Sequence, residues 1–323
     1  MKILTAALIA LLATSVACRS KKTPQAAESG LAVAAAAMPA SPASDNSPKA
    51  PQIDSARAIK YVREIVGFGP RPVGSGAHKR AESYIISHLK TAGAQVESDA
   101  FDTQTPVGKM AMRSIIGKFP GKKDGVIVIA SHYDTLYGRK DFVGANDGGS
   151  SSGLLLELAN QLGAQKQRVG YSVWLVFTDG EEAIKQWTAT DNDYGSRHLA
   201  EKWQSDGTLK KIKAFLLLDM IGDSDLNIDR DASSTSWLED LIYKAAGDVG
   251  YQSYFFGREV GMDDDHTPFL KRGVPCADVI DYDYGYNNVF WHTPQDTLDK
   301  LSPHSLQVVG DVAMRAVELV DQR

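Results

Sequence analysis

Short, largely apolar runs that lead into acidic or imidazole side chains recur through the middle of the chain. Runs of this length, bounded by polar residues and turns, are typical of buried strands. The runs and the residues that follow them are 126–130 before Ser-His-Tyr-Asp at 131–134, 171–178 before Asp-Gly-Glu-Glu at 179–182, and 214–218 before Asp219. Asp147 and His292 repeat this setting. The pattern predicts that carboxylates and imidazoles gather at one edge of a sheet.

Apolar positions at helical spacing alternate with these strands. Asp54 or Ser55 is expected to cap the first helix, and Ser302-Pro303 is expected to open the last. The expected helices cover 55–65, 81–89, 149–162, 236–249 and 301–320. This alternation favours an α/β fold with a central mixed, largely parallel sheet that has helices on both faces and holds the site at its strand ends.

The first residues are typical of an export signal. Met1-Lys2 gives a positive start, residues 3–13 are a short apolar core, and small residues precede Cys18. Those small residues resemble a bacterial lipobox, which implies removal of residues 1–17 and lipidation of the Cys18 sulfur. Arg19 stands where an inner-membrane retention signal places Asp, so we expect export to the periplasm of the bacterial envelope and anchoring in the outer membrane. Ser15 is a less typical lipobox start than Leu, which leaves plain secretion open.

The segment 18–52 is rich in Ala, Pro, Ser and Lys. This composition buries too little apolar surface to fold, so a flexible tether is expected. Residues 53–323 contain no Pro/Gly-rich break and are expected to form a single domain. We also expect a monomer.

Composition narrows the range of functions. The chain has 323 residues, of which 43% are hydrophobic, enough for a sizeable core. A net charge of -5 without a basic stripe gives no reason to expect a nucleic-acid partner. Of the two cysteines, Cys18 is the expected lipid anchor and the only expected contact with a membrane. Cys276 is expected to be a small buried strand residue.

The pair Glu181-Glu182 carries the most chemical information. Adjacent carboxylates are costly to crowd together unless a cation compensates them or one of them holds a proton. A Glu pair alone is common at a solvated helix start, where it complements the helix dipole. The balance shifts because oxygen and imidazole ligands, typical of catalytic zinc, end other segments: His132, Asp147, Asp219 and His292. We therefore expect a metal site with a neighbouring general base.

Motifs around these residues resemble the zinc site of the M28 aminopeptidase clan. Within that clan the chain is more similar to the glutaminyl-peptide cyclotransferases, on the stretches 181–187, 194–200 and 264–275. Aminopeptidases pass from the Glu pair to Gly-Ser over a much shorter connection. The resemblance covers nearly the whole chain from Ile53. The clan motifs are Ser131-His-Tyr-Asp134, Val143-Gly-Ala-Asn-Asp147, Asp179-Gly-Glu-Glu182, Leu218-Asp219 and Trp291-His292-Thr293.

This resemblance implies a zinc aminopeptidase-like α/β architecture and one Zn²⁺ per chain. The implied reaction converts the N-terminal glutamine of peptides or proteins to pyroglutamate and releases ammonia. The implied ligands are Asp147, Glu182 and His292. Glu181 is the implied general acid/base, which needs a carboxylate with a raised pKa.

Further residues take their implied roles from the same resemblance. Asp219 and Asp264 are expected to form a hydrogen-bonded carboxylate network beside Glu181. Trp187 and Trp291 are expected to shape the pocket around the substrate's side chain, although each alone would be an ordinary core or rim aromatic.

The chain departs from the animal cyclotransferases at three points. Asp278 stands where they have a pocket histidine, and the Asp281–Asn288 segment is longer and rich in Tyr. The cysteine pair near the active site of the secreted animal enzymes is missing. These departures leave the pocket's fine shape and its substrate preference open.

The remaining acidic and histidine residues are expected to have structural roles. Asp263–His266 is not expected to be a further metal cluster, and Asp191-Asn-Asp193 is expected to be a solvated turn. His198 is expected to be structural. Surface positions are expected for His78 and His304.

Two alternatives remain open. A two-zinc M28 aminopeptidase would use His132 and Asp219 for a second ion with Asp147 bridging, and Glu181 would activate a water. An envelope lipoprotein that binds peptides without turnover would keep the fold alone. Trp187 and Trp291 favour the cyclotransferase, and the complete set of ligands speaks against the binding protein.

Overall fold

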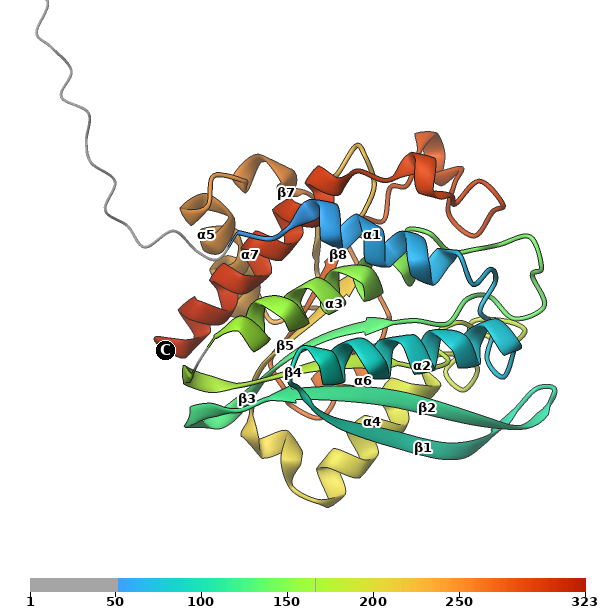
Figure 1. Cartoon of the computed structure of the whole chain (residues 1–323), viewed down its shortest axis with the longest axis horizontal. Coiled ribbons are helices and arrows are strands. Elements are labelled where there is room, and N and C mark those ends of the chain that lie inside the picture. The colour runs from blue at the N-terminus through green and yellow to red at the C-terminus, as the bar shows by residue number, and fades with distance from the viewer. Residues whose placement is uncertain (1–51, 166) are drawn as a thin grey trace, which may run out of the picture. The chain divides into compact units, whose positions relative to one another are not determined.

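A six-stranded mixed sheet runs through the computed structural model, which describes residues 52–165 and 167–323 (Figure 1). The strands are β1 Gln95–Thr105, β2 Gly108–Phe119, β3 Gly121–His132, β4 Arg168–Thr178, β5 Ile212–Asp219, β6 Ile228–Asp231, β7 Phe255–Val260 and β8 Cys276–Ile280. The sheet order is β1-β2-β4-β3-β5-β8. The β1/β2 and β2/β4 pairs are antiparallel and the other neighbours are parallel, which confirms the expected mixed, largely parallel sheet. Strands β6 and β7 form a separate parallel pair.

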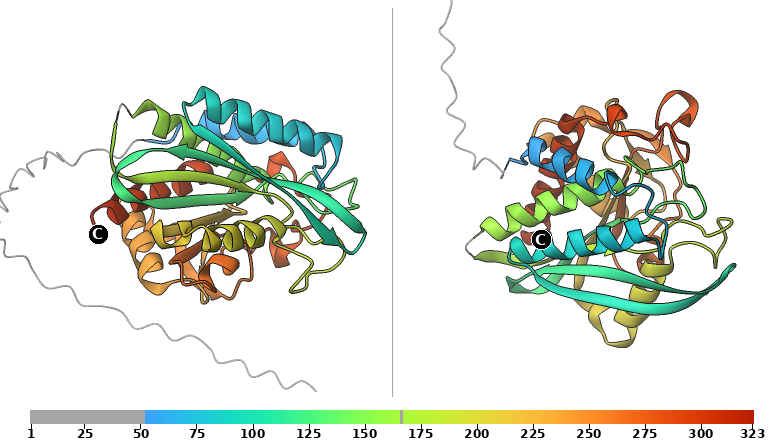
Figure 2. Two further views of the ribbon diagram at one scale, coloured as in Figure 1. Left: turned by 90° about the horizontal axis from the view of Figure 1, so that it is seen from below. Right: turned by 45° about the vertical axis from the view of Figure 1, so that its right-hand side comes forward.

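Helices cover both faces of this sheet, as expected (Figure 1 and Figure 2). They are α1 Ser55–Val66, α2 Gly76–Thr91, α3 Gly149–Ala164, α4 Tyr194–Ser205, α5 Ser236–Asp248, α6 Thr267–Leu270 and α7 Pro303–Asp321. Helices α1, α2, α3, α5 and α7 share one hydrophobic cluster with Ile127 and Ile129 of β3. Helices α4 and α6 share a second cluster with Val126 and Val128, because alternate side chains of a strand point to opposite faces.

The predicted helix starts are confirmed by their caps. Asp54 accepts a hydrogen bond from the Arg57 backbone N–H at 2.9 Å and so caps α1. Ser302 caps α7, whose first turn contains Pro303. Such caps satisfy backbone donors that a helix start leaves without a partner.

Periodicity did not predict the antiparallel hairpin of β1 and β2, nor the β6/β7 pair. Strand β1 lies at the edge of the sheet and contains few apolar residues. Its buried and exposed positions therefore alternate only loosely. Its pairing partner β2 supplies the buried residues Ile115 and Ile116. The hairpin therefore depends on pairing with β4 more than on its own hydrophobic pattern.

Other expectations concern single segments. Cys276 is fully buried in β8, as predicted. The leader 1–17, Cys18 and the tether up to residue 51 lie outside the described residues. Within the described ranges, no helix is long and apolar enough to cross a membrane.

Candidate active site

The carboxyl ends of the parallel strands bring the predicted site residues to one edge of the sheet. His132 ends β3, Glu181-Glu182 follows β4, and Asp219 ends β5. Parallel strands point the same way, so residues that follow them in different parts of the sequence meet at a single edge. The expectation that Asp147 and His292 also end strands is wrong, because Asp147 lies just before α3 and His292 lies in the connection from β8 to α7.

Asp147, Glu182 and His292 converge with one ligand atom each within 4.8 Å of the others. His292 Nε2 is 3.2 Å from Asp147 Oδ2 and 3.4 Å from Glu182 Oε2. Both carboxylates are buried, and among residues 52–165 and 167–323 no group hydrogen-bonds to Asp147 Oδ2 or Glu182 Oε1. Buried carboxylate oxygens without a partner are costly unless a cation neutralises them. This donor set of two oxygens and one imidazole fits zinc.

His132, Asp147 and Asp219 form a second convergent group that shares Asp147 with the first. His132 Nε2 is 3.1 Å from Asp147 Oδ1 and 3.2 Å from Asp219 Oδ1. The contact with Asp219 is a hydrogen bond, so this ring nitrogen already has a partner. The residues that a second metal ion would need are therefore adjacent, as the sequence predicted.

Met220 and His292, at the metal groups, hold the left-handed backbone conformation. Met220, directly after Asp219, has φ 50°, and the metal-group residue His292 has φ 55°. This conformation costs about 1–3 kcal/mol for a residue with a side chain and persists where its surroundings fix it. Asn146 fixes the Met220 turn, since its side chain donates to the Met220 carbonyl and accepts from the Gly222 N–H.

Buried carboxylates hold the backbone of the two ligand loops. Asp134 accepts from the N–H groups of Gly180, Glu181 and Glu182 at 3.0, 3.2 and 3.4 Å. In the same way Asp296 accepts from Asn146 and Asp147 at 2.8 and 3.2 Å. These roles of Asp134 and Asp296 were not predicted from the sequence, although Asp134 ends the Ser131–Asp134 motif.

Glu181 lies within a cluster of buried carboxylates. Its ligand atoms lie within 4.8 Å of Asp193 and Asp264. Burial raises the pKa of Glu181 well above its ordinary range, and the charges of Glu182 and Asp264 add to this effect while His132 opposes it. The nearness of Asp264 agrees with the predicted network, whereas the hydrogen-bond partner of Asp219 is His132.

The prediction of a solvated turn at Asp191-Asn-Asp193 is wrong. These three residues are between 2% and 4% exposed. The turn is buried because the Asp193 N–H bonds to the Glu181 carbonyl and the Asp191 side chain accepts from Ile184. Sequence spacing gives no sign of these contacts, and a cluster of Asp and Asn is more often a surface turn.

Beside the metal group lies a cavity of about 430 Å³ that both predicted tryptophans line. The Trp291 ring stacks on His292 with the centroids 4.0 Å apart, and it also meets Tyr282 edge to face. Trp187 lies at the rim and is 40% exposed. Tyr282, from the Tyr-rich segment, completes this wall. Asp278 does not line the cavity but is fully buried, and burial raises its pKa well above its ordinary range, with the Asp264 charge adding to it.

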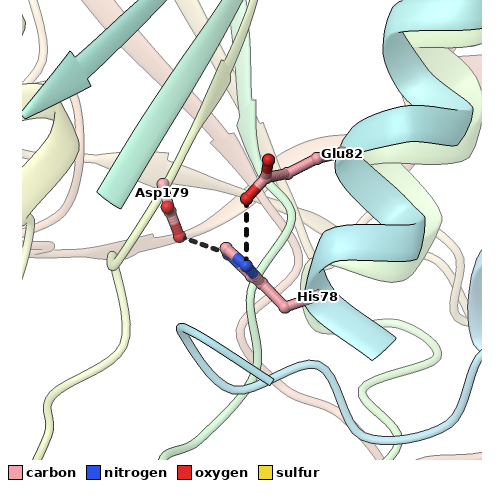
Figure 3. A group of neighbouring side chains, drawn as sticks. All are labelled: His78, Glu82 and Asp179. Atoms are coloured by element: carbon pink, nitrogen blue, oxygen red, sulfur yellow. Dashed lines mark hydrogen bonds and ion pairs between the residues drawn. The ribbon is translucent and has the colours of Figure 1, made fainter. Parts of the chain in front are cut away.

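His78, predicted to lie on the surface, is instead 1% exposed (Figure 3). Its Nε2 is 2.7 Å from Asp179 Oδ1, and its Nδ1 is 3.2 Å from Glu82 Oε1. The ring also stacks on Tyr133. Burial of the ring favours the neutral form, but the facing Asp179 carboxylate and then Glu82 outweigh it and raise the pKa of His78 to about 10. The ring thus bridges helix α2 to Asp179, which begins the loop that carries Glu181.

His304 is exposed, as predicted. His198 Nδ1 lies 2.7 Å from Asp99 Oδ2 and the ring stacks on Phe101, so His198 joins α4 to β1. His266 Nε2 lies 3.2 Å from Asp231 Oδ2. His198 and His266 thus each link two separate parts of the fold, which agrees with the structural role expected for His198.

Known proteins similar to this chain were found by sequence and by structure. Residues 114–317 match the model of peptidase family M28. The glutaminyl-peptide cyclotransferase of Drosophila melanogaster is 32% identical over 252 residues, which are 70% of this chain and 70% of that protein. The crystal structure of an Acidobacteriales bacterium glutaminyl cyclase is 51% identical with a TM-score of 0.83, over 89% of this chain and 100% of that chain. A Zn-dependent exopeptidase from Parabacteroides distasonis is 27% identical with a TM-score of 0.74, over 85% and 100% of the two chains.

Proposed function

The chain belongs to peptidase family M28 and, within it, to the glutaminyl-peptide cyclotransferases, and we propose that it catalyses their reaction. In this reaction the N-terminal glutamine of a peptide or protein becomes pyroglutamate, and ammonia is released. The observation that carries the proposal is the cavity that Trp187 and Trp291 line directly beside the metal group and Glu181. A cavity of about 430 Å³ has room for the side chain and amine of one terminal residue.

We propose that Asp147, Glu182 and His292 hold one zinc ion. Support comes from Asp147 Oδ2 and Glu182 Oε1, which are buried without a partner, whereas His132 Nε2 in the neighbouring group is already bonded to Asp219. When bound, zinc supplies a Lewis acid that polarises an amide carbonyl and stabilises negative charge on its oxygen.

The nucleophile is the substrate's own α-amine. Its nitrogen forms a bond to the side-chain amide carbon, and the bond from that carbon to the amide nitrogen breaks. The cavity walls contributed by Trp187 and Trp291 would hold the chain end folded so that amine and amide meet, which replaces a costly search for the reactive geometry. No water takes part in this reaction.

Glu181 is proposed to move the proton. Its carboxylate accepts a proton from the attacking amine and returns it to the leaving nitrogen, which departs as ammonia. Asp264 and Asp193 lie within 4.8 Å of it, so a proton can be shared within this buried cluster. Asp219 is proposed to belong to the same proton-sharing network, because it ends β5 at the same edge of the sheet and contacts His132 at 3.2 Å.

The proposal is tested with the purified full chain carrying Cys18→Ser, given one peptide that begins with Gln and a matched peptide that begins with Leu. We expect ammonia release and a product lighter by one ammonia from the Gln peptide alone, with about one zinc per chain by elemental analysis. Removal of the first residue from both peptides would reject cyclisation.

A two-zinc aminopeptidase is the second candidate. The His132, Asp147 and Asp219 group, which shares Asp147 with the first group, favours it, as does the similarity to a Zn-dependent exopeptidase. The same peptide experiment separates the two candidates. Release of free leucine together with about two zinc ions per chain would establish this second function.

We further propose that the protein is exported and anchored to the bacterial outer membrane through lipid on Cys18. The support is the sequence pattern of residues 1–18 and the Arg19 that follows. In a Gram-negative host we expect the protein in the outer-membrane fraction with a mass that matches residues 18–323 plus lipid. Cys18→Ser should leave the membrane fraction, and a membrane-bound Cys18→Ser protein would contradict the anchor.

A further inference from the structure

We propose that Asp191, Tyr194 and Arg197 form a clamp that sets the position of Trp187 and thereby selects the substrate side chain. The clamp acts on residues 182–192, named here the Trp187 loop. These residues have no regular secondary structure. The inference rests on the proposed function only for the identity of the substrate, since the clamp itself consists of contacts within the chain.

The two ends of the Trp187 loop are tied together. The N–H groups of Asp193, Tyr194 and Gly195 donate to the carbonyls of Glu181, Gly180 and Asp179 at 2.9, 2.8 and 2.9 Å. The chain therefore enters and leaves the loop side by side, as in compact surface loops with closed ends. These bonds fix the base of the loop next to Glu181 but leave its middle to other contacts.

The Asp191 carboxylate holds the middle of the loop from inside. It accepts from the backbone N–H groups of Ile184, Lys185 and Gln186 at 2.9, 3.0 and 3.0 Å. Tyr194 donates its hydroxyl to Asp191 at 2.7 Å. Burial alone would raise the pKa of Asp191, but these donors lower it below its ordinary value, so the acceptor is charged. The three held residues are those directly before Trp187.

Arg197 of α4 holds the other side of the same loop. Its guanidinium donates to the backbone carbonyls of Ala189, Thr190 and Asn192 at 3.2, 3.2 and 2.6 Å. It also lies 4.9 Å from the centre of the Tyr194 ring. Asp191 thus binds N–H groups before Trp187, and Arg197 binds carbonyls after it.

Among the described residues the Trp187 side chain lacks the aromatic stacking that holds Trp291, so its position is expected to follow the clamped backbone. Trp187 is 40% exposed, and its ring stacks on no other aromatic ring among residues 52–165 and 167–323. Trp291, by contrast, is stacked on His292. Glu181 and Glu182 are held separately, since Asp134 accepts from their N–H groups. Loosening the clamp should therefore move Trp187 and leave the metal group in place.

The test is a double-mutant cycle on the Cys18→Ser full chain, with turnover of a Gln-initiated peptide as the measurement. We expect Asp191→Ala to raise KM at least about tenfold, a larger change than its effect on kcat, with zinc content nearly unchanged, because charge-assisted hydrogen bonds are lost. In a Trp187→Ala background, Asp191→Ala should raise KM little further. Asp206→Ala is the matched control, since Asp206 also accepts a backbone N–H but lies exposed at the far end of α4.

Arg197→Lys provides an independent arm should Asp191→Ala fail to fold. It keeps the charge but loses the planar guanidinium that reaches several carbonyls, so we expect a higher KM in the same cycle. The clamp would be overturned if Asp191→Ala or Arg197→Lys raised KM equally in the presence of Trp187 and in the Trp187→Ala background. It would also be overturned if neither variant changed KM. Failure of the wild type to cyclise Gln would reject the proposed function instead, and the cycle would then be read on the peptide that the wild type does cleave.

Discussion

Replacing Glu181 by Gln is expected to lower kcat about 10²- to 10⁴-fold while the protein keeps its zinc. The reason is that the amide is nearly the same size as the carboxylate but cannot accept a proton from the attacking amine. Glu181 is not in the metal group formed by Asp147, Glu182 and His292, and its backbone N–H stays bound to Asp134. Pre-steady-state and steady-state ammonia release, with zinc measured on the same sample, check this result.

Glu182→Gln is the matched control. It makes the same chemical change one residue away, but removes charge from the metal group, so we expect zinc content to fall with turnover. The two variants should thus separate proton transfer from metal binding. If Glu181→Gln keeps normal turnover, Glu181 has no part in the mechanism, and loss of zinc in that variant would assign it to the metal instead.

The strand-end chemistry could be predicted because it depends on local sequence. Each apolar run of β3, β4 and β5 ends in the polar residues that the site uses, so periodicity alone located His132, Glu181 and Asp219. Helix starts were predictable for the same reason, since caps such as Asp54 bond within three residues. Pairing of the edge strand β1 is not local, and no pattern within it marks the hairpin.

The residues that hold the site in position could not be predicted from the sequence. His78 bonds to Asp179 across 101 positions, and Asp134 bonds to the Glu181 loop across 47. Such contacts exist only after the sheet has assembled, and the residues involved look like ordinary polar positions beforehand. Asp191 bonds within its own loop, yet its sequence context is that of a surface turn. His78, Asp134 and Asp191 differ from ordinary surface residues in being buried, and the sequence does not show which single polar residues are buried.

Replacing His78 by Gln is expected to lower the free energy of unfolding by about 3–5 kcal/mol near neutral pH, because it leaves the Asp179 carboxylate buried without a cation. Asp179 is fully buried, and its other oxygen accepts a hydrogen bond from the Arg113 backbone N–H. The Glu82 carboxylate on the opposite side of the ring also faces Arg113, so it retains a partner. Urea unfolding of the Cys18→Ser chain with and without His78→Gln measures the difference.

The same difference should depend on pH in a direction that the structure fixes. The pKa of His78 is raised to about 10 in the folded protein, against about 6.5 in an unfolded chain. When folding raises the pKa of a histidine, the stability that this adds is fully present below the pKa of the unfolded chain. It is lost as the pH rises through the pKa of the folded protein. The gap between wild type and His78→Gln should therefore be widest near about pH 6 and narrow toward about pH 10. His304→Gln, at an exposed histidine, should show no such gap, and a His78 gap that stays constant with pH would mean that folding does not raise the pKa of His78.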